Sequence, residues 1–342
     1  MRNYLKILFI DEYSITPKYI QLVNGIIAGI NSGQIEKGDM LPSINDLSYA
    51  LDISRNTIER VYNELKKLGI VGSVPGKGVF ILNTDFKRPL KILLLFNKLS
   101  SHKKIIYDSF VKAVGDNAAV DFYIYNNDFY LFKRILTEKL NSDYNKFVIV
   151  PYFIDNDQEA QALINTIPKE KLVIMDKLVD GLTGQYSAVY EDFEQDIYGA
   201  LSTLLDSLSK YNTIKIIFPK STYYSKGIVK GFKDFCADYA FDYEVLTHLN
   251  DENIQPGVVY INLVEDDLVL LVKKIIDSSL VIGKDVGLIS YNETSIKQVI
   301  LNGITTISTN FEALGEKTAE VVLNNDNTHY NVPFTVTLRN SL

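Results

Sequence analysis

The sequence contains little cysteine, histidine or tryptophan, and so little of the chemistry that these residues provide. It has one cysteine, Cys236, three scattered histidines and no tryptophan in 342 residues. A single cysteine cannot form an intrachain disulfide, and no catalytic histidine motif lies beside it, so we expect a buried, unreactive side chain. The histidines lack HxH or HExxH spacing, and no CxxC occurs. These absences argue against zinc and redox chemistry, and we expect neither a metal nor a cofactor.

Long apolar runs are also absent. No stretch approaches the roughly 18 apolar residues of a membrane-spanning helix. The N-terminus, MRNYLKILFIDEYS, has too short an apolar core for a secretion signal and is acidic where a cleavage site would lie. With 46% hydrophobic residues, a chain of this length can bury the cores of two or three domains. We therefore expect a globular protein in the cytoplasm.

The acidic charge is confined to one part of the chain. Residues 1 to 85 contain nine Lys and Arg and nine Asp and Glu, whereas the remainder contains 26 and 33 and accounts for the whole net charge of −7. The field that a charged partner meets is local and falls off within about one Debye length. A neutral first segment can therefore bind a phosphate backbone if its cations lie on one face.

Two helices are predicted at the start of this neutral segment. Thr16 and Pro17 are typical of a helix N-cap and first turn, and apolar residues then repeat at helical spacing until Gly33 ends the helix. Ser43 and Asp46 form a predicted capping box, with Ser43 as N-cap and the carboxylate three residues on. The second helix that begins there is short.

The stretch from Ser54 to Gly69 predicts a third helix. Its inward-facing apolar positions follow steps of three and four residues: Ile58, Val61, Leu65 and Leu68. The outer face then carries a mixed polar set: Arg55, Asn56, Glu59, Arg60 and Asn63. Two short β runs, IVGSV and GVFIL, are joined by Pro75, Gly76 and Lys77, where Pro followed by Gly favours a type II turn. Three helices and a hairpin in this order are typical of a winged helix-turn-helix.

A change of pattern follows at NTDFKRPL, residues 83 to 90, which contains proline and mixed charge without periodicity and is predicted to be the linker. From residue 91 onward, near-continuous apolar strands alternate with amphipathic helices in two units of about 100 residues or more. This alternation predicts an α/β body whose parallel sheets are covered by helices on both faces, in two lobes with a cleft between them.

Both parts resemble known families. LPSINDLSYALDISRNTIERVYNELKKLGIVGSVPGKGVFI resembles the DNA-binding domain of GntR-type bacterial transcription regulators, with its Leu-Pro-Ser opening, Ser-Arg-x-Thr helix and Gly-Lys-Gly wing. The stretches KDVGLISYNETSIKQVILNGITTISTNFEALGEKTAEVVLNN and VYEDFEQDIYGAL resemble the effector domain of LacI-type repressors, a type I periplasmic-binding-protein fold. Arabinose-type repressors combine two such domains. The resemblance implies a DNA-binding domain at residues 1–84, a linker at 83–90 and a sugar-binding effector and dimerisation domain at 91–342.

The resemblance places the third helix in the major groove of operator DNA. The candidate contacts are Ser43, Asn45, Ser54, Arg55, Asn56, Thr57, Glu59, Arg60, Gly76, Lys77 and Gly78. Arginine suits guanine or phosphate, asparagine suits adenine, and hydroxyl groups suit phosphate oxygens. Lys77 at the tip of the wing is expected to reach the minor groove or its backbone.

Two of these positions depart from the GntR pattern, because Asn45 and Glu59 stand where the family usually has arginine. Losing two cations weakens the non-specific, salt-dependent part of DNA binding. Glu59 can accept a hydrogen bond from cytosine, and Asn45 can read adenine. Alternatively, Glu59 pairs with Arg55 one helical turn away and only orients it, a contact worth about 0.2–0.5 kcal/mol. The sequence leaves both roles of Glu59 open.

The effector site is predicted from polar residues at the carboxyl ends of strands, which face the cleft in such folds. The candidates are Asn97, Lys98, Tyr152, Asp176, Lys220, Lys226, Asn262, Asn292 and Glu293. The resemblance favours Asn292, which stands where the family has a sugar-contacting aspartate, whereas Ile228 replaces its cleft arginine. Each candidate alone is equally compatible with an ordinary surface loop. Without tryptophan, ring stacking falls to Tyr or Phe, and the candidates are Tyr107, Tyr152, Tyr223, Tyr224 and Tyr291.

These features predict a homodimeric repressor of a carbohydrate-utilisation operon that binds a pseudo-palindromic operator and is released or repositioned by a sugar. The chain also looks like regulators encoded beside L-fucose utilisation genes, so L-fucose or a pentose is the predicted effector. Two alternatives stay open: a purine or other non-sugar metabolite in the same cleft, or an enzyme-like body that binds pyridoxal phosphate. The second needs a Schiff-base lysine context that is not found, and GxGxxG, P-loop and GxSxG motifs are absent. We therefore expect a regulator that is not an enzyme.

Overall fold

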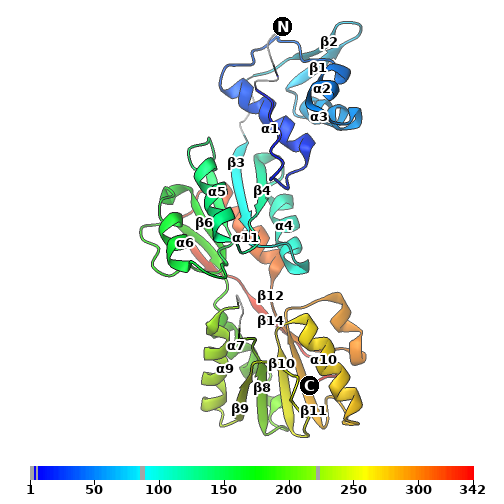
Figure 1. The fold of residues 1–342 in the computed structure, drawn as a ribbon, viewed down its shortest axis with the longest axis vertical. Helices are drawn as coiled ribbons and strands as arrows, with labels where there is room; N and C mark the ends of the chain where they lie inside the picture. The colour runs from blue at the N-terminus through cyan, green and yellow to red at the C-terminus, as the bar shows by residue number, and fades with distance from the viewer. Residues whose placement is uncertain (1–3, 5–6, 85–88, 221–223) are drawn as a thin grey trace.

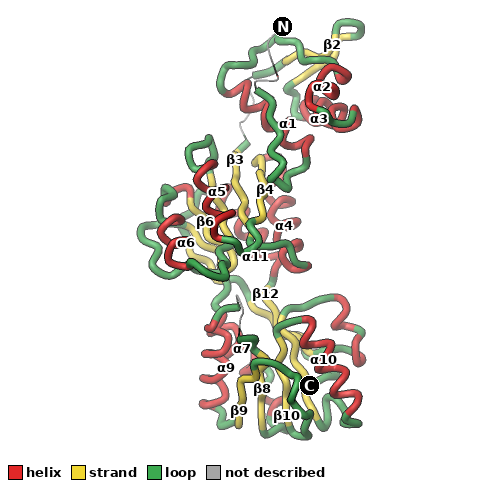
Figure 2. The backbone as a smooth tube through the Cα atoms, in the orientation of Figure 1, coloured by secondary structure: helices red, strands yellow, loops and turns green. Residues whose placement is uncertain are grey.

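The computed structural model describes residue 4 and residues 7–84, 89–220 and 224–342 (Figure 1). They form an elongated molecule in which a head, a middle lobe and a distal lobe follow one another along the long axis (Figure 2). The head holds the N-terminal elements, and the distal lobe contains the C-terminus. The linker predicted at residues 83 to 90 falls partly outside the described residues.

The head consists of three helices and a hairpin: α1 (Lys18–Asn31), α2 (Ile44–Leu51), α3 (Arg55–Lys67), β1 (Val71–Val74) and β2 (Gly78–Ile81). The strands pair antiparallel, and the Lys77 N–H donates to the Val74 carbonyl at 2.9 Å across the turn. Gly76 has a φ of +73°, which is the type II geometry that Pro75 followed by Gly76 predicts. The apolar stripe of α3 is buried as its spacing predicts, except for Leu68, which is half-exposed at the end of the helix.

The middle lobe, here called the N-lobe, is built on a parallel sheet of order β13-β7-β6-β5-β3-β4. Its strands are β3 (Leu90–Phe96), β4 (Ala118–Ile124), β5 (Lys146–Ile149), β6 (Leu172–Asp176), β7 (Ser187–Tyr190) and β13 (His329–Asn331). One face packs on α4 (Ser101–Val114) and α11 (Phe311–Asn324), the other on α5 (Phe129–Lys139) and α6 (Asp157–Ile164). The apolar strands are buried because helices cover both faces.

The distal lobe, here called the C-lobe, has a sheet of order β14-β12-β11-β10-β8-β9, in which only β14 runs antiparallel to its neighbour. Its strands are β8 (Thr213–Ile217), β9 (Asp242–Leu246), β10 (Val258–Asn262), β11 (Val286–Tyr291), β12 (Thr305–Thr309) and β14 (Phe334–Thr337). Its helices are α7 (Phe193–Thr203), α8 (Leu205–Leu208), α9 (Lys226–Asp238) and α10 (Glu265–Asp277). The predicted architecture, a winged helix-turn-helix followed by two parallel α/β lobes, is the observed one.

The chain crosses between the lobes three times: after β7, between β12 and α11, and between β13 and β14. The two predicted units are therefore not two uninterrupted stretches of sequence, because α11 and β13 return to the N-lobe. β13 is exposed along its length, so its sequence HYN carries no apolar pattern that could predict this return. The crossings place the carboxyl ends of both sheets opposite each other and so define the interlobe cleft.

The start of α1 differs from the prediction. Pro17 occupies the N-cap position, and no side chain caps the helix. The Thr16 hydroxyl lies instead against β4 of the N-lobe, where its oxygen accepts a hydrogen bond from the Phe122 N–H at 2.6 Å. The predicted cap was wrong because helix-start patterns use neighbouring residues only, whereas Phe122 is 106 residues away.

Two further expectations concern the cysteine and membrane-spanning helices. Cys236 is fully buried in the C-lobe core, and burial raises the pKa of its thiol to about 12, so the expected unreactive side chain is observed. Within the described ranges, no helix has both the length and the apolar character needed to cross a bilayer.

Candidate DNA interface and interlobe site

The start of α3 is positioned by caps that the sequence predicts. The Ser54 oxygen accepts from the Thr57 N–H at 3.2 Å, and the Ser43 oxygen accepts from the Asp46 N–H at 3.1 Å at the start of α2. The Ser43 hydroxyl also donates to the Asp46 carboxylate at 2.7 Å. To donate to a phosphate, the Ser43 hydroxyl would have to give up its hydrogen bond to Asp46. In this structure Ser43 therefore caps α2.

The exposed face of α3 brings together the polar side chains predicted to share it. Asn56, Glu59, Arg60 and Asn63 line one open surface, and Arg55 is exposed in the first turn. No ion pair within the described part of the chain joins Glu59 to Arg55, so the purely orienting role considered for Glu59 has no contact to support it. The Glu59 carboxylate is exposed and can accept a hydrogen bond from a base.

Arg60 is held differently from Arg55. Its guanidinium carbon lies 3.8 Å from the centroid of the Tyr19 ring on α1. This cation–π contact draws the side chain toward α1. Arg60 is therefore held against α1, whereas Arg55 at the helix N-terminus has no such contact among the described residues.

The remaining DNA candidates are exposed at two other places. Asn45 lies on the first turn of α2, and Lys77 lies at the tip of the hairpin. Gly76 and Gly78 flank Lys77 with φ values of +73° and +114°, a backbone region that glycine adopts without strain. Thr57 is only half-exposed, because its N–H and hydroxyl both contact Ser54.

The second candidate site is the junction between the lobes. A cavity there is lined from the N-lobe by Asn97, Lys98, His102, Lys103, Tyr152 and Asp176, and from the crossings and C-lobe by Glu191, Phe193, Tyr224, Ser225, Tyr291, Asn292 and Phe311. Its free volume is about 30 Å³. That is far less than the roughly 300–1,000 Å³ of a typical ligand pocket, so the lobes must separate or side chains must move before a sugar can enter.

Five of the nine predicted ligand residues line this cavity: Asn97, Lys98, Tyr152, Asp176 and Asn292. Lys220 and Lys226 are exposed outside it. Asn262 is fully buried, and its amide nitrogen donates to the Val264 carbonyl at 3.1 Å, which closes its own turn. A position at the carboxyl end of a strand does not fix the direction of the side chain. For Lys220, Lys226 and Asn262, that position alone did not predict whether the side chain lines the cavity.

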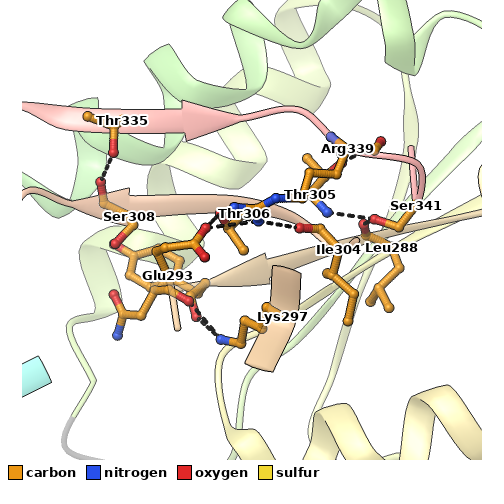
Figure 3. A network of polar contacts seen from close by, with 12 residues as sticks. Leu288, Glu293, Lys297, Ile304, Thr305, Thr306, Ser308, Thr335, Arg339 and Ser341 are labelled. Atoms are coloured by element: carbon orange, nitrogen blue, oxygen red, sulfur yellow. Dashed lines mark hydrogen bonds and ion pairs between the residues drawn. The ribbon is translucent and has the colours of Figure 1, made fainter. Parts of the chain in front are cut away.

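Glu293, the ninth predicted residue, faces away from the cavity. Figure 3 shows its carboxylate beside Thr306 and Arg339, and the Arg339 guanidinium lies 2.9 Å from it. The same network includes Ser341, whose hydroxyl accepts from the Thr305 N–H at 2.7 Å. Glu293 therefore fastens the C-terminal residues to the C-lobe sheet.

A charged network that the sequence reasoning missed lies at the centre of the junction. The buried Lys103 ammonium forms an ion pair with Asp176, and the Tyr152 hydroxyl donates to the other Asp176 oxygen at 2.5 Å. Burial lowers the pKa of Lys103 to about 7 against the opposing effect of Glu191. A lysine one helical turn before the apolar Ile106 on the buried face of α4 was the sequence signal that could have revealed it.

Two further carboxyl groups adjoin this network. Burial raises the pKa of Glu191 to about 7, against the opposing effect of Lys103. Burial also raises the pKa of Asp196 to about 8, and the neighbouring charges of Glu191 and Asp192 add to the shift. These groups can carry a proton near neutral pH, so they can donate as well as accept hydrogen bonds.

Several buried polar atoms around the cavity find no hydrogen-bond partner among the described residues: Asn97 Oδ1, Tyr291 Oη and Asn292 Oδ1. Buried polar groups are nearly always paired, so such atoms call for a partner from outside the chain. They come from both lobes, since Asn97 follows β3, Tyr291 ends β11 and Asn292 follows that strand.

Aromatic and imidazole rings surround these polar atoms. Tyr152, Tyr224 and Tyr291 line the cavity as candidates for ring stacking, whereas Tyr107 stacks on Phe122 at 4.6 Å, away from it, and Tyr223 lies outside the described residues. His102 stacks on Phe311 at 5.0 Å. Burial, with the nearby lysines, lowers the pKa of His102 to about 3, so the ring is neutral at pH 7.

Ile228 shows why the arginine of the LacI pattern has no equivalent on α9. Its side chain is fully buried in the C-lobe core with Phe232, so the position faces the core and not the cavity. Of the two nearby lysines, Lys226 is exposed and Lys230 pairs with Glu194 at 2.7 Å. The buried cation of the junction is Lys103, which comes from the opposite lobe.

Comparison with known proteins separates the head from the body. Residues 18–81 match the family described as "Bacterial regulatory proteins, gntR family". The chain is 35% identical over 65 residues to an uncharacterized HTH-type transcriptional regulator, YhcF, of Bacillus subtilis, covering 19% of this chain and 54% of that protein. It is 32% identical over 85 residues to the HTH-type transcriptional regulator Rv1152 of Mycobacterium tuberculosis, covering 25% and 68%. It is also 32% identical over 65 residues to the arabinose metabolism transcriptional repressor of Geobacillus stearothermophilus, covering 19% and 18%.

The body is similar in fold to solved regulators. The probable maltose operon transcriptional repressor of Staphylococcus aureus superposes with a TM-score of 0.60 at 17% identity, over 73% of this chain and 97% of that one. The lac repressor dimer bound to operator and an anti-inducer superposes with a TM-score of 0.60 at 14% identity, over 75% and 94%. The body thus has the two-lobed fold of LacI-type regulators. The relatives and neighbours named here are transcription regulators, not enzymes.

Proposed function

The chain belongs to the gntR family of bacterial regulatory proteins, and from this premise we propose that it represses a carbohydrate-utilisation operon and responds to a neutral sugar in the interlobe cavity. One observation carries the proposal. In a chain with a gntR-type head, buried polar atoms of both lobes, on Asn97, Tyr291 and Asn292, lack partners around a single cavity. A ligand that satisfies both lobes favours their closed arrangement, because it gains contacts there that it lacks when they are apart.

The cavity residues suit hydroxyl groups. The buried Asp176 and Glu191 can each accept from a sugar hydroxyl, and the Lys103 ammonium can donate to one. Tyr291 and Phe311 line the cavity and supply aromatic surface that suits the CH side of a pyranose. L-fucose or a pentose is the effector we propose, in keeping with the arabinose metabolism repressor among the relatives of the head.

On DNA, we propose that α3 lies in the major groove and the hairpin reaches the adjacent minor groove. Arg55, Asn56 and Glu59 would read bases, while Arg60 and Lys77 would contact the backbone. In this proposal residues 1–84 form the DNA-binding domain, residues 83–90 the linker and residues 91–342 the effector domain, in the cytoplasm.

We also propose a homodimer on a pseudo-palindromic operator, with half-sites about one helical turn apart. The exposed apolar side chains of the C-lobe support it. Val269 and Ile276 lie on the outer face of α10, and Val299 lies in the adjacent segment that Lys297 joins to α10 through Glu265 at 3.0 Å. A second copy would remove these side chains from water.

A thermal-shift panel tests the effector. We expect a neutral pentose or 6-deoxyhexose to raise the unfolding midpoint, because a ligand present at about 100 times its Kd stabilises the native state by about 2.7 kcal/mol. Purine bases and pyridoxal phosphate in the same panel represent the two alternatives. A shift with either of them and none with any sugar would overturn the sugar proposal.

Operator selection from random duplex DNA tests the proposed DNA binding by a dimer. We expect enrichment of an inverted repeat, whose two half-sites the heads of a dimer contact. Enrichment of no sequence at all would count against a repressor.

A further inference from the structure

Residues 11–16, which precede α1, lie along the outer edge of the N-lobe sheet. The Ile15 N–H donates to the Phe122 carbonyl at 2.8 Å, and the Phe122 N–H donates to the Thr16 hydroxyl oxygen at 2.6 Å. The Ser14 hydroxyl also donates to the Phe122 carbonyl, at 3.3 Å. Both outward-facing backbone groups of Phe122 are therefore paired with this one segment.

An ionic contact fastens the beginning of the same segment. The Asp11 carboxylate accepts from the Tyr123 hydroxyl at 2.7 Å and lies 2.9 Å from the Lys139 ammonium of α5. The side chains of Asp11 and Lys139 are each only 14% exposed, so water screens this ion pair less than it screens a surface pair. Next to it, the Arg134 guanidinium lies 4.8 Å from the centroid of the Tyr13 ring.

Away from this segment, the head and the N-lobe pack incompletely. A cavity of about 270 Å³ lies between them and is lined by Leu68 at the end of α3 and by Tyr107 and Val111 of α4. A second, of about 530 Å³, is lined by Asn31 of α1 and by Lys91 and Asn145 of the N-lobe. Among the described residues, polar contacts between the head and the N-lobe are made by residues 11–16 and by the Asn24 amide of α1, which donates to the Asp121 carboxylate of β4 at 3.4 Å.

We infer that residues 11–16 form a latch that binds the edge strand β4 and fixes the direction of α3 relative to the effector cleft. The chain then joins head to body at two places: the latch before α1 and the stretch that follows β2. Two attachments restrict the rotation that a single flexible connection allows. The inference concerns the docking of the head alone and does not depend on which ligand the cleft binds.

β4 also reaches the cleft. One residue beyond the strand, the Tyr125 hydroxyl donates to the carbonyls of Val150 and Tyr152 at 2.7 and 3.0 Å, and Tyr152 contacts Asp176 in the cavity. The strand that the latch holds is thus also fixed to a residue of the effector site. If Tyr152 moved on ligand binding, Tyr125 would transmit the movement to β4, the strand to which the head is docked.

Hydrogen–deuterium exchange of the full chain tests the latch without requiring a ligand or DNA. We expect the amides of Ile15 and Phe122 to exchange much more slowly than in an unstructured peptide, because both donate hydrogen bonds at the latch. Thr16→Val removes the acceptor for Phe122 while keeping the side-chain shape, and should speed exchange at Phe122 about tenfold. Exchange at Leu22 in the core of the head and at Leu93 in the core of the N-lobe should stay unchanged.

Thr337→Val is the matched control, because Thr337 is exposed on β14 in the C-lobe and should leave exchange at Phe122 unaltered. Tyr123→Phe removes only the hydroxyl that donates to Asp11, so it keeps the inference testable should Thr16→Val not fold. We expect it to speed exchange in the peptide that begins at Asp11. Unprotected amides at residues 11–16 in the native chain, or latch variants that exchange like the control, would overturn the inference.

Discussion

The two junctions of the molecule, head to N-lobe and N-lobe to C-lobe, differ in how their polar groups are paired. At the latch, Asp11, Thr16 and Phe122 all have hydrogen-bond partners. At the interlobe cavity, Asn97, Tyr291 and Asn292 each have a buried oxygen without one. The cited polar groups of the latch are thus satisfied within the chain, whereas those of the cavity keep hydrogen-bonding capacity that no described residue uses.

The largest effect should come from breaking the buried ion pair of the interlobe junction. Lys103→Ala leaves Asp176 as an uncompensated buried charge, which we expect to lower the free energy of unfolding by about 3–5 kcal/mol. Lys104→Ala, which removes the neighbouring exposed pair with Asp108, is the control and should cost less than about 1 kcal/mol. Urea denaturation measures both, and equal losses would show that the buried network does not stabilise this junction.

The exposed face of α3 carries polar groups that we propose contact DNA, and Glu59 is the one to test. If Glu59 accepts a hydrogen bond from cytosine, Glu59→Ala should relax the preference at one operator position by about 1–3 kcal/mol. Lys77→Ala at the tip of the hairpin should weaken binding to all sequences alike, because a phosphate contact carries no base information. Competition binding to single-base operator variants distinguishes them. Uniformly tighter binding by Glu59→Ala would mean that its charge only repels DNA.

Removing an unpaired group should separate ligand binding from stability. The Tyr291 hydroxyl has no partner in the part of the chain that the structure describes, so Tyr291→Phe should leave the unfolding midpoint nearly unchanged without ligand. Affinity for the sugar that the thermal-shift panel selects should fall about tenfold, the loss of one hydrogen bond. Tyr49→Phe, 91% exposed on α2, is the control in isothermal calorimetry. Unchanged affinity in Tyr291→Phe would place the ligand elsewhere.

The dependence of stability on pH concerns both junctions, which should respond in different pH windows. Burial raises the pKa of Asp196 to about 8, so the folded state keeps a proton that the unfolded state releases near pH 4. The contribution of Asp196 to stability therefore falls as pH rises from about 4 to 8. Glu191 acts in the same direction up to about pH 7. Thermal unfolding of Asp196→Asn should show a weaker decline than the native chain over this range, and an identical decline would rule out Asp196 as its source.

The latch should respond only to stronger acid. Burial acts to raise the pKa of Asp11, but hydrogen bonds from Tyr123 and Lys139 outweigh it and leave the pKa below its ordinary value of 3.8. The contribution of Asp11 is therefore present above about pH 4 and is lost as pH falls through its lowered pKa. Exchange at residues 11–16 should stay slow at pH 5 and accelerate, after correction for intrinsic rates, below pH 4. An acceleration already present between pH 7 and 5 would contradict this assignment.

The sequence predicts features that depend on neighbouring residues and misses those that depend on distant ones. The caps at Ser43 and Ser54 and the turn at Gly76 follow from local patterns and are observed. Alternating apolar strands and helices predict both lobes, because burial on two faces leaves a strong periodic pattern. The return of α11 and β13 to the N-lobe is decided by pairing between β13 and β7, more than 130 residues apart, and has no local pattern.

The effector cavity shows the same division. Asn97 and Asn292 were predicted because they follow apolar strands, and the structure brings them to one cavity. Lys103 lies on the apolar stripe of α4, which is a local signal, but its pairing with Asp176, 73 residues away, has no local pattern. Glu293 was assigned to the cavity because its backbone lies at a strand end, whereas the direction of its side chain is set by Arg339.

The position of the latch also bears on how the body behaves when it is produced alone. β4 ends the N-lobe sheet, and Phe122 would present an unpaired N–H and carbonyl to solvent if residues 11–16 were removed. Exposed edges of this kind pair with the edges of other molecules. A body truncated at residue 89 would therefore be prone to self-association through β4, and the segment that docks the head also protects the soluble state of the sheet beneath it.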